Sequence, residues 1–464
     1  MRLLPTSFAS HLKDSTSLKH RTFSAGAWAL VSYFVSLSLR FIGTLILSRI
    51  FDPSTFGILA VITTVQVVIA LLTDIGLRQT VVQSKSAEVH EFLDTAWTLQ
   101  IFRGVFVWLM AATLAAILYL AVRGHLVPLN SVYSTPGLPL YLAVAAVSAI
   151  FYGFQSMKAI VASRSLNLRQ VSVNEIVAQS AGLIFVVIAG WLTRSLWAYI
   201  ASQLLTAALV SLLSHLALKG RSDRLGYNRI FAAEFFRFGR WTFMSSAMSA
   251  LSSNGDRLLL ASWISPQVLG YYSIAYNLAS LADGLLGRMF VSVAFPALSE
   301  AARNQTTRVP EIFFRMKWLT DSALLFMAGL LFSSGEAIVD LLYDPRYASA
   351  GWMLKCLSFS LVFSRYGLTQ NAYMALGRPE YLTILSVTKI VSLFTLAPLG
   401  FFFFGVEGAV AGIAFHQAPA ALWTFFLNRK YNLNSLRVEA GVLLAWGAGW
   451  LMGAAFFALR ALLH

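Results

Sequence analysis

Long apolar segments follow one another along almost the whole chain. Each can supply the roughly 20 residues that an α-helix needs to cross a bilayer, and none alternates over about ten residues as membrane-barrel strands do. Only 12% of the 464 residues are charged, about half the share found in soluble domains. The sequence therefore predicts an all-α, polytopic membrane protein. The predicted spans are residues 23–48, 56–77, 97–122, 138–158, 173–192, 196–218, 238–263, 268–295, 316–342, 350–376, 381–404, 406–428 and 438–460.

The first 22 residues are polar and basic and precede the first apolar segment. They lack the apolar core of a signal peptide, so residues 1–22 are expected to be an uncleaved cytoplasmic leader. With the leader in the cytoplasm, 24 Lys and Arg lie on the cytoplasmic side and 5 on the opposite side. The positive-inside rule therefore predicts a cytoplasmic N-terminus. Because the net charge of +15 is spread over one membrane face, nucleic acid is not expected as a partner.

Two segments 213 residues apart share one pattern: a span ends, a proline turn follows, and a glycine opens the next span. Pro53 corresponds to Pro266, and Gly57 to Gly270. Both copies start from the cytoplasm, as in parallel transporter repeats, although common membrane turns could also coincide in this way. The pattern predicts two six-helix lobes and a peripheral extra helix. The expected parts are the leader 1–22, an N-lobe at 23–218, a cytoplasmic linker at 219–237, a C-lobe at 238–428 and an additional transmembrane helix at 438–460.

Five short motifs carry a resemblance to a known family: residues 47–57 (LSRIFDPSTFG), 74–77 (DIGL), 254–259 (NGDRLL), 295–299 (FPALS) and 376–379 (LGRP). Together, at this spacing, they resemble the polysaccharide transporter family of the multidrug/oligosaccharidyl-lipid/polysaccharide exporter superfamily. The resemblance covers roughly residues 20–430. An odd number of spans departs from the family's usual even number. The resemblance implies a flippase for lipid-linked oligosaccharides.

Several cations lie within predicted spans, where a charge is costly unless it faces a cavity or a partner. Arg40, Arg257, Arg365 and Lys389 are the candidates for a cationic cavity between the lobes. Arg365 lies near mid-span and is expected to need an anion to compensate it. A guanidinium can bind phosphate oxygens bidentately, and the resemblance implies a polyprenyl diphosphate there. Internal salt bridges are the alternative, above all for Arg257, which follows Asp256.

Among the acidic residues, Asp283 lies nearest to mid-span. Because a buried carboxylate can carry a coupling proton, Asp283 and, second, Asp256 are the candidates for proton or ion coupling. Asp74, Glu175 and Asp321 lie near cytoplasmic span ends and are expected to act as helix-end or cap residues. For His416 and Gln417, a sugar-binding or proton site and an interhelical hydrogen bond are both open. Tyr276, Asn277, Tyr366, Asn371 and Tyr373 are further candidates for sugar contacts.

No pattern for catalysis occurs in the sequence. HExxH and phosphate-loop patterns are absent, and the single cysteine, Cys356, allows neither a disulfide nor a cysteine metal site. We therefore expect a transporter without cofactors or a metal, not an enzyme. The leading hypothesis is a flippase in the bacterial inner membrane that moves an undecaprenyl-diphosphate-linked oligosaccharide for surface polysaccharide or lipopolysaccharide synthesis by alternating access. Its expected partners are that substrate, membrane lipid, and polymerase or export proteins of the assembly pathway. A cation-coupled drug exporter and a membrane-embedded transferase or polymerase are the alternatives.

Overall fold

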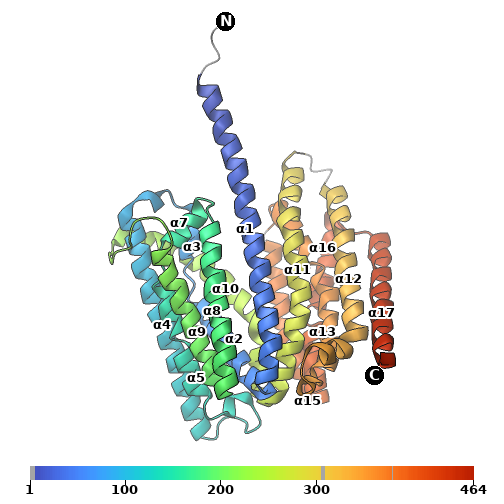
Figure 1. Ribbon diagram of the computed structural model, residues 1–464. Coiled ribbons are helices and arrows are strands. Elements are labelled where there is room, and N and C mark those ends of the chain that lie inside the picture. Colours follow the sequence, from blue (N-terminus) through green and yellow to red (C-terminus); the bar gives the residue numbers. More distant parts are fainter. Residues whose placement is uncertain (1–5, 305–308, 379, 464) are drawn as a thin grey trace. The chain divides into compact units, whose positions relative to one another are not determined.

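The computed structural model describes residues 6–304, 309–378 and 380–463, and the regular elements of this part of the chain are all helices (Figure 1). They form two compact units. Unit 1 comprises Met1–Phe51, Val65–Gly124 and Pro136–Ala247, and unit 2 comprises Asp52–Thr64, His125–Thr135 and Met248–His464. The prediction of an all-α polytopic membrane protein is confirmed.

Unit 1 is built from antiparallel helices joined by short turns. The first helix begins at Thr6 and runs to Ile50, so the polar leader is the first part of the same helix as the first span. Arg194 adopts a left-handed φ of 48° at the end of one helix, and the hydroxyl of Ser195 accepts a hydrogen bond from Trp197 N to cap the next. The elements are α1 (Thr6–Ile50), the latter part of α2 (Pro53–Leu72), α3 (Leu77–Gln83), η1 (Lys85–Glu88), α4 (His90–Arg123), α5 (Leu138–Ala145), α6 (Ser148–Gly153), α7 (Lys158–Arg164), α8 (Arg169–Thr193), α9 (Leu196–Leu216) and the first part of α10 (Arg229–Trp263).

Unit 2 holds the start of α2, the short η2 (Val132–Ser134), the end of α10 and the rest of the chain. Its long helices carry apolar side chains both in the core and on their exposed faces. The remaining elements are α11 (Pro266–Asn304), α12 (Val309–Leu342), η4 (Pro345–Tyr347), α13 (Ala350–Ser364), α14 (Gly367–Ala375), α15 (Glu380–Phe415), α16 (Ala418–Lys430) and α17 (Leu436–Leu463).

Each of the thirteen predicted spans falls on one or more of these helices. By length and apolarity, eight helical segments in the described residues could cross a membrane, or nine if the bent pair Leu138–Gly153 and Lys158–Arg164 is one span. One of the eight, Glu380–Lys430, contains two predicted spans. The membrane-spanning character is therefore confirmed, whereas the number thirteen stays a prediction.

The break between the predicted spans 381–404 and 406–428 is confirmed at Gly405, which has φ 63° and ψ −141°. Only glycine adopts such a backbone without strain. The helix halves on either side fold back on each other so closely that a Cβ on Gly400 would lie 2.1 Å from the carbonyl oxygen of Gly408. The two glycines therefore make a tight helical hairpin possible.

The predicted span 350–376 is broken into α13 and α14. Between them, Tyr366 has ψ near 0°, and its N–H donates to the carbonyl oxygen of Phe363 rather than to that of residue 362. Arg365 therefore lies at a break in a helix, where side chains and backbone can face a cavity.

The two proline–glycine corners of the predicted repeat contact each other. A Cβ on Gly57 would lie 1.8 Å from Pro266 O, and a Cβ on Gly270 would lie 1.9 Å from Pro53 O. This contact is reciprocal, as a two-fold relation between the copies requires, and it places both corners together in unit 2. The relation between two whole six-helix lobes stays a prediction.

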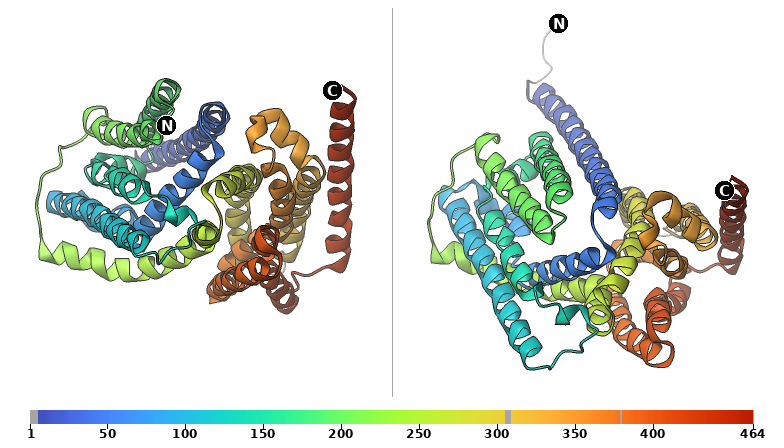
Figure 2. Two further views of the ribbon diagram at one scale, coloured as in Figure 1. Left: turned by 90° about the horizontal axis from the view of Figure 1, so that it is seen from below. Right: turned by 60° about the horizontal axis from the view of Figure 1, so that its bottom comes forward.

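The last helix packs mainly along one neighbouring helix of unit 2, and its place as a peripheral addition stays a prediction. Helix α17 lies along α12 (Figures 1 and 2). Glycines allow the two backbones to touch: a Cβ on Gly329 would lie 2.1 Å from Trp446 O, and one on Gly449 would lie 2.0 Å from Phe326 O. Small residues at such a seam are the usual means by which membrane helices pack closely.

Residues 219–237, predicted as a linker, are bound to unit 1. The guanidinium of Arg221 lies 3.1 Å from the carboxylate of Asp94, and Ser156 Oγ donates to Asp223 Oδ2 at 2.5 Å. Phe235 is fully buried and stacks on Phe92. These contacts continue into α10, so the division between the units falls after Ala247.

Candidate functional site

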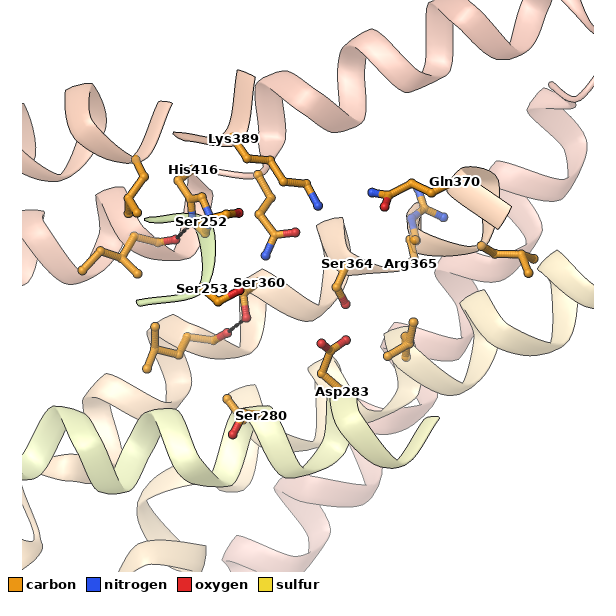
Figure 3. A pocket seen from close by; sticks show the side chains of 18 of the residues that line it. Ser252, Ser253, Ser280, Asp283, Ser360, Ser364, Arg365, Gln370, Lys389 and His416 are labelled. Atoms are coloured by element: carbon orange, nitrogen blue, oxygen red, sulfur yellow. Dashed lines mark hydrogen bonds between the residues drawn. The ribbon is translucent and has the colours of Figure 1, made fainter. Parts of the chain in front are cut away.

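A polar cavity of about 670 Å³ lies inside unit 2 (Figure 3). Helices α10 to α15 and the α15–α16 junction line it. Five serines give it hydroxyl groups, and its charged lining residues are two carboxylates, Asp256 and Asp283, and two cations, Arg365 and Lys389. The serines are Ser252, Ser253, Ser280, Ser360 and Ser364. Such a polar lining within apolar helices marks a path or binding site for a polar solute.

Lys389 and Asp283 point into this cavity from α15 and α11 (Figure 3). Within the described residues, neither side chain has an ion-pair partner within 4 Å or a hydrogen bond. Lys389 is therefore an ammonium group available to an anionic ligand, and Asp283 is a carboxylate available to a proton or cation. The structure thus brings together one predicted substrate residue and the leading coupling candidate.

Beside the cavity, four charged side chains form a closed ion-pair network. Lys317 Nζ lies 2.5 Å from Asp321 Oδ2 and 3.3 Å from Glu439 Oε1. Arg365 contacts the same two carboxylates, with Nη1 3.3 Å from Asp321 and Nη2 2.7 Å from Glu439. The hydroxyl of Tyr366 donates to Glu439 at 3.3 Å. We call Lys317, Asp321, Arg365 and Glu439 the charge cluster; its formal charge is zero.

The charge cluster bears on two expectations. For Arg365 it matches the alternative of internal salt bridges, because Asp321 and Glu439 compensate its charge and its side chain is only 9% exposed. Asp321 was expected to cap a helix end, yet it is fully buried between Lys317 and Arg365. Arg365 also lines the cavity, so its role in substrate binding stays a prediction.

Arg257 and Asp256 lie on the same part of α10 but have different neighbours. The guanidinium of Arg257 sits 4.2 Å from the ring centroid of Tyr276, and its Nε is buried without a hydrogen-bond partner in the part of the chain that the structure describes. Asp256 is buried, accepts a hydrogen bond from Tyr272 and lines the cavity. The salt bridge considered between these two neighbours does not occur in the described residues; a cation–π contact holds Arg257 instead.

Arg40 belongs to unit 1, on α1, and its side chain is exposed. No ion pair of Arg40 occurs within the described part of the chain. Its membership of the substrate site stays a prediction.

The expected polar contacts divide into cavity and core positions. His416 and Gln417 line the cavity. The ring Nδ1 of His416 contacts Ile413 O, three residues earlier, so this contact is local, and an interhelical hydrogen bond of Gln417 stays a prediction. Tyr276 and Asn371 line the cavity too. Tyr373 is fully buried and donates to Asn428 at 2.8 Å, which is a packing role.

A second cavity, of about 610 Å³, lies in unit 1 between α2, α4, α6, α8 and α9. Sequence reasoning missed it, because its polar residues come from helices far apart in the chain. Asp74 and Glu175, expected as helix-end residues, both line it. The sequence did contain one indication of this cavity, namely several glutamines within apolar spans, among them Gln66, Gln100 and Gln203.

Comparisons with known proteins identify the fold. The chain is similar to the lipid II flippase MurJ (TM-score 0.68, 14% identity, 94% of this chain and 99% of that chain). It is also similar to a MATE-family multidrug resistance transporter in an inward-facing conformation (TM-score 0.65, 12% identity, 88% of this chain and 94% of that chain). At these identities the likeness shows the fold alone.

Sequence relatives point to polysaccharide biosynthesis. The lipopolysaccharide biosynthesis protein WzxC of Escherichia coli is 24% identical over 302 residues, which are 65% of this chain and 58% of that protein. The succinoglycan biosynthesis transport protein ExoT of Rhizobium meliloti is 24% identical over 340 residues, which are 72% of this chain and 65% of that protein. The chain thus covers less than two thirds of either relative.

A membrane protein encoded in the cps region of Klebsiella pneumoniae is 22% identical over 437 residues, which are 91% of this chain and 85% of that protein. The family described as polysaccharide biosynthesis protein matches residues 46–351. Since this match extends over more than half of the 464 residues, the chain belongs to the polysaccharide biosynthesis protein family.

Proposed function

We propose that this protein is a transporter, not an enzyme, and that it flips an undecaprenyl-diphosphate-linked oligosaccharide across the bacterial inner membrane for surface polysaccharide or lipopolysaccharide synthesis. The observation that carries the proposal is the unpaired ammonium of Lys389 in a polar cavity among membrane-spanning helices. An unpaired charge at this depth is costly. A ligand with a diphosphate would offset that cost, and family membership agrees with such a ligand.

The contacts of the four proposed substrate residues rank them as candidates for binding the diphosphate. Lys389 is free to bind an anion, whereas Arg365 is already engaged with two carboxylates and would have to exchange one of them for a phosphate. Arg257 has a buried, unpartnered Nε, and Arg40 is exposed. We place Lys389 first and keep the three arginines as further phosphate contacts.

For coupling, we propose Asp283 before Asp256. Asp283 faces the cavity without a hydrogen bond in the described residues and lies opposite Lys389 (Figure 3). Asp256 is held by Tyr272 and is less accessible. Protonation of Asp283 would raise the net positive charge of the cavity and strengthen anion binding. We further propose alternating access of two lobes, with the N-terminus in the cytoplasm.

The test is complementation of a strain that lacks this gene. Lys389→Met keeps the length of the side chain and removes its charge, and we expect surface polysaccharide to fall by roughly tenfold or more, because charge-assisted bonds to phosphate are lost. Lys389→Arg keeps a cation and should retain part of the export. Lys355→Met is the matched control, since Lys355 pairs with Glu336 at 2.8 Å and does not line the cavity.

Protein in the membrane fraction is measured alongside. Normal export by Lys389→Met at equal protein level would remove Lys389 from the substrate site. A failure of the unaltered gene to restore polysaccharide to the deletion strain would reject the proposed transport function itself.

A further inference from the structure

The unit 1 cavity is rich in carboxamide side chains. Five glutamines line it, contributed by α2, α3, α4, α9 and the turn after α6. Its volume of about 610 Å³ lies in the range of sites for small molecules. The glutamines are Gln66, Gln79, Gln100, Gln155 and Gln203.

Two of these glutamines form a pair that leaves one donor and one acceptor unused. Gln203 Nε2 donates to Gln66 Oε1 at 2.7 Å. The Nε2 of Gln66 and the Oε1 of Gln203 are buried and have no hydrogen-bond partner among the described residues. Turning both amides around exchanges their roles but still leaves one donor and one acceptor, so the result does not depend on how the amides are assigned.

Orphaned polar groups of this kind destabilise a fold by about 1–3 kcal/mol each. They are therefore expected where a ligand or water satisfies them. Another lining glutamine, Gln100, is different: its amide donates to the carbonyl oxygens of Tyr152, Gly153 and Gln155. Gln100 thus has a structural role, whereas the pair offers free hydrogen-bonding capacity.

The charges of the cavity balance. Asp74 and Glu175 are its acidic lining residues, and Arg78 and Arg103 its basic ones. Arg103 is turned toward the backbone, with Nε donating to Thr73 O at 2.9 Å and Nη2 to Ala70 O at 2.7 Å. The lining therefore has no excess of either charge. It favours a neutral, polar ligand.

A sugar meets these requirements. A hydroxyl group is both donor and acceptor, and an acetamido group carries one N–H and one carbonyl oxygen, matching the unused groups of Gln66 and Gln203. The ring of Tyr152, which is 44% exposed, lines the same cavity and supplies an apolar face for the C–H groups of a pyranose.

We propose that the unit 1 cavity binds the neutral sugar portion of the substrate through Gln66, Gln203 and Tyr152. This inference rests on the proposed transport function for the identity of its ligand. It assigns saccharide recognition to unit 1, separate from the phosphate contact proposed at Lys389.

The test uses saturation-transfer NMR on the purified full-length protein in lipid nanodiscs, with N,N′-diacetylchitobiose and cellobiose as probes. We expect a saturable signal with at least one disaccharide, unaffected by an equal concentration of inorganic pyrophosphate. Gln66→Met/Gln203→Met should reduce this signal at least fivefold. Gln267→Met is the control, because Gln267 is exposed, bonds Tyr271 and lies outside both cavities; it should leave the signal unchanged.

The double variant also has a stability readout. Because the methionines remove two orphaned groups, its melting temperature should equal or exceed that of the unaltered protein. If it does not accumulate, Tyr152→Leu at the exposed rim replaces it, and the signal should fall at least twofold.

No saturable signal with either disaccharide, or full signal in the glutamine variant, would overturn the proposal. Complementation distinguishes the two ideas. If the gene fails to restore polysaccharide while glutamine-dependent binding persists, the transport function fails and the sugar site stands. If export is restored but binding does not depend on the glutamines, the sugar site alone fails.

Discussion

Glu439→Gln in the charge cluster tests whether α17 stabilises unit 2 electrostatically. The replacement keeps the side-chain shape but leaves Lys317, Asp321 and Arg365 with a net charge of +1. Glu439 is 13% exposed and lies 2.7 Å from Arg365 and 3.3 Å from Lys317. Removing one partner from a buried ion pair costs about 3–5 kcal/mol. Since Glu439 retains some solvent contact, we expect the lower end, about 3 kcal/mol.

A second variant separates charge balance from packing. Glu439→Gln/Arg365→Met leaves only the neutral Lys317–Asp321 pair, which is 2.5 Å apart. Since replacing buried ion pairs by apolar groups is often neutral in stability, this double variant should be more stable than Glu439→Gln alone. The two changes should therefore couple by about 2 kcal/mol.

The assay is thermal unfolding of the purified protein in detergent, with the amount in the membrane fraction as a second readout. A loss of about 3 kcal/mol corresponds to a decrease in melting temperature of about 3 °C for a chain of this length. Glu380→Gln is the control, because the Arg378–Glu380 pair is 55% and 50% exposed and exposed pairs contribute little. An unchanged melting temperature in Glu439→Gln, or a double variant less stable than both single variants, would refute the reasoning.

Three further predictions follow from backbone geometry and a buried hydroxyl. Gly329→Ala should lower membrane accumulation, since its Cβ would meet Trp446 O at 2.1 Å and overpacking costs about 1–3 kcal/mol; Gly441→Ala on α17, with open space around it, should not. Gly405→Ala should destabilise the protein by about 1–2 kcal/mol through its φ of 63°, measured by thermal unfolding. Burial raises the pKa of Tyr133 to about 12, which favours the neutral phenol in the fold. Stability from this shift is complete below pH 10 and lost as pH rises through 12, so melting temperatures across that window should fall further in the unaltered protein than in Tyr133→Phe.

Local sequence signals predicted the helices well. The length of an apolar segment predicts a span. Gly405 marks the break between two spans, because a residue without a Cβ can adopt its backbone conformation. The Pro53–Gly57 and Pro266–Gly270 corners were also recognisable, since proline ends a helix and glycine permits the contact that the structure shows.

Long-range pairing was not predictable in the same way. Asp321 and Glu439 compensate Arg365 from 44 and 74 residues away along the chain, and no periodic pattern links such positions. One pair of the charge cluster was predictable from the sequence: Lys317 and Asp321 are four residues apart and therefore share one face of a helix. The prediction of Asp321 as a helix-end residue rested on its distance from the span end alone, which gives no sign of this pair.

The two candidate sites lie each within one unit, and this has a consequence for the proposed transport. A ligand shifts a conformational equilibrium only if it binds the two conformations with different affinity. A sugar bound only by the Gln66–Gln203 pair, or a diphosphate bound only by Lys389, keeps the same contacts when one unit moves as a rigid body, and so exerts no bias. A substrate that carries both groups is different, because its two ends are joined by covalent bonds of fixed length. Only conformations in which that length spans both sites gain both sets of contacts. Under the proposed function, the linked sugar and diphosphate would therefore drive the conformational change, whereas either fragment alone would bind without driving it.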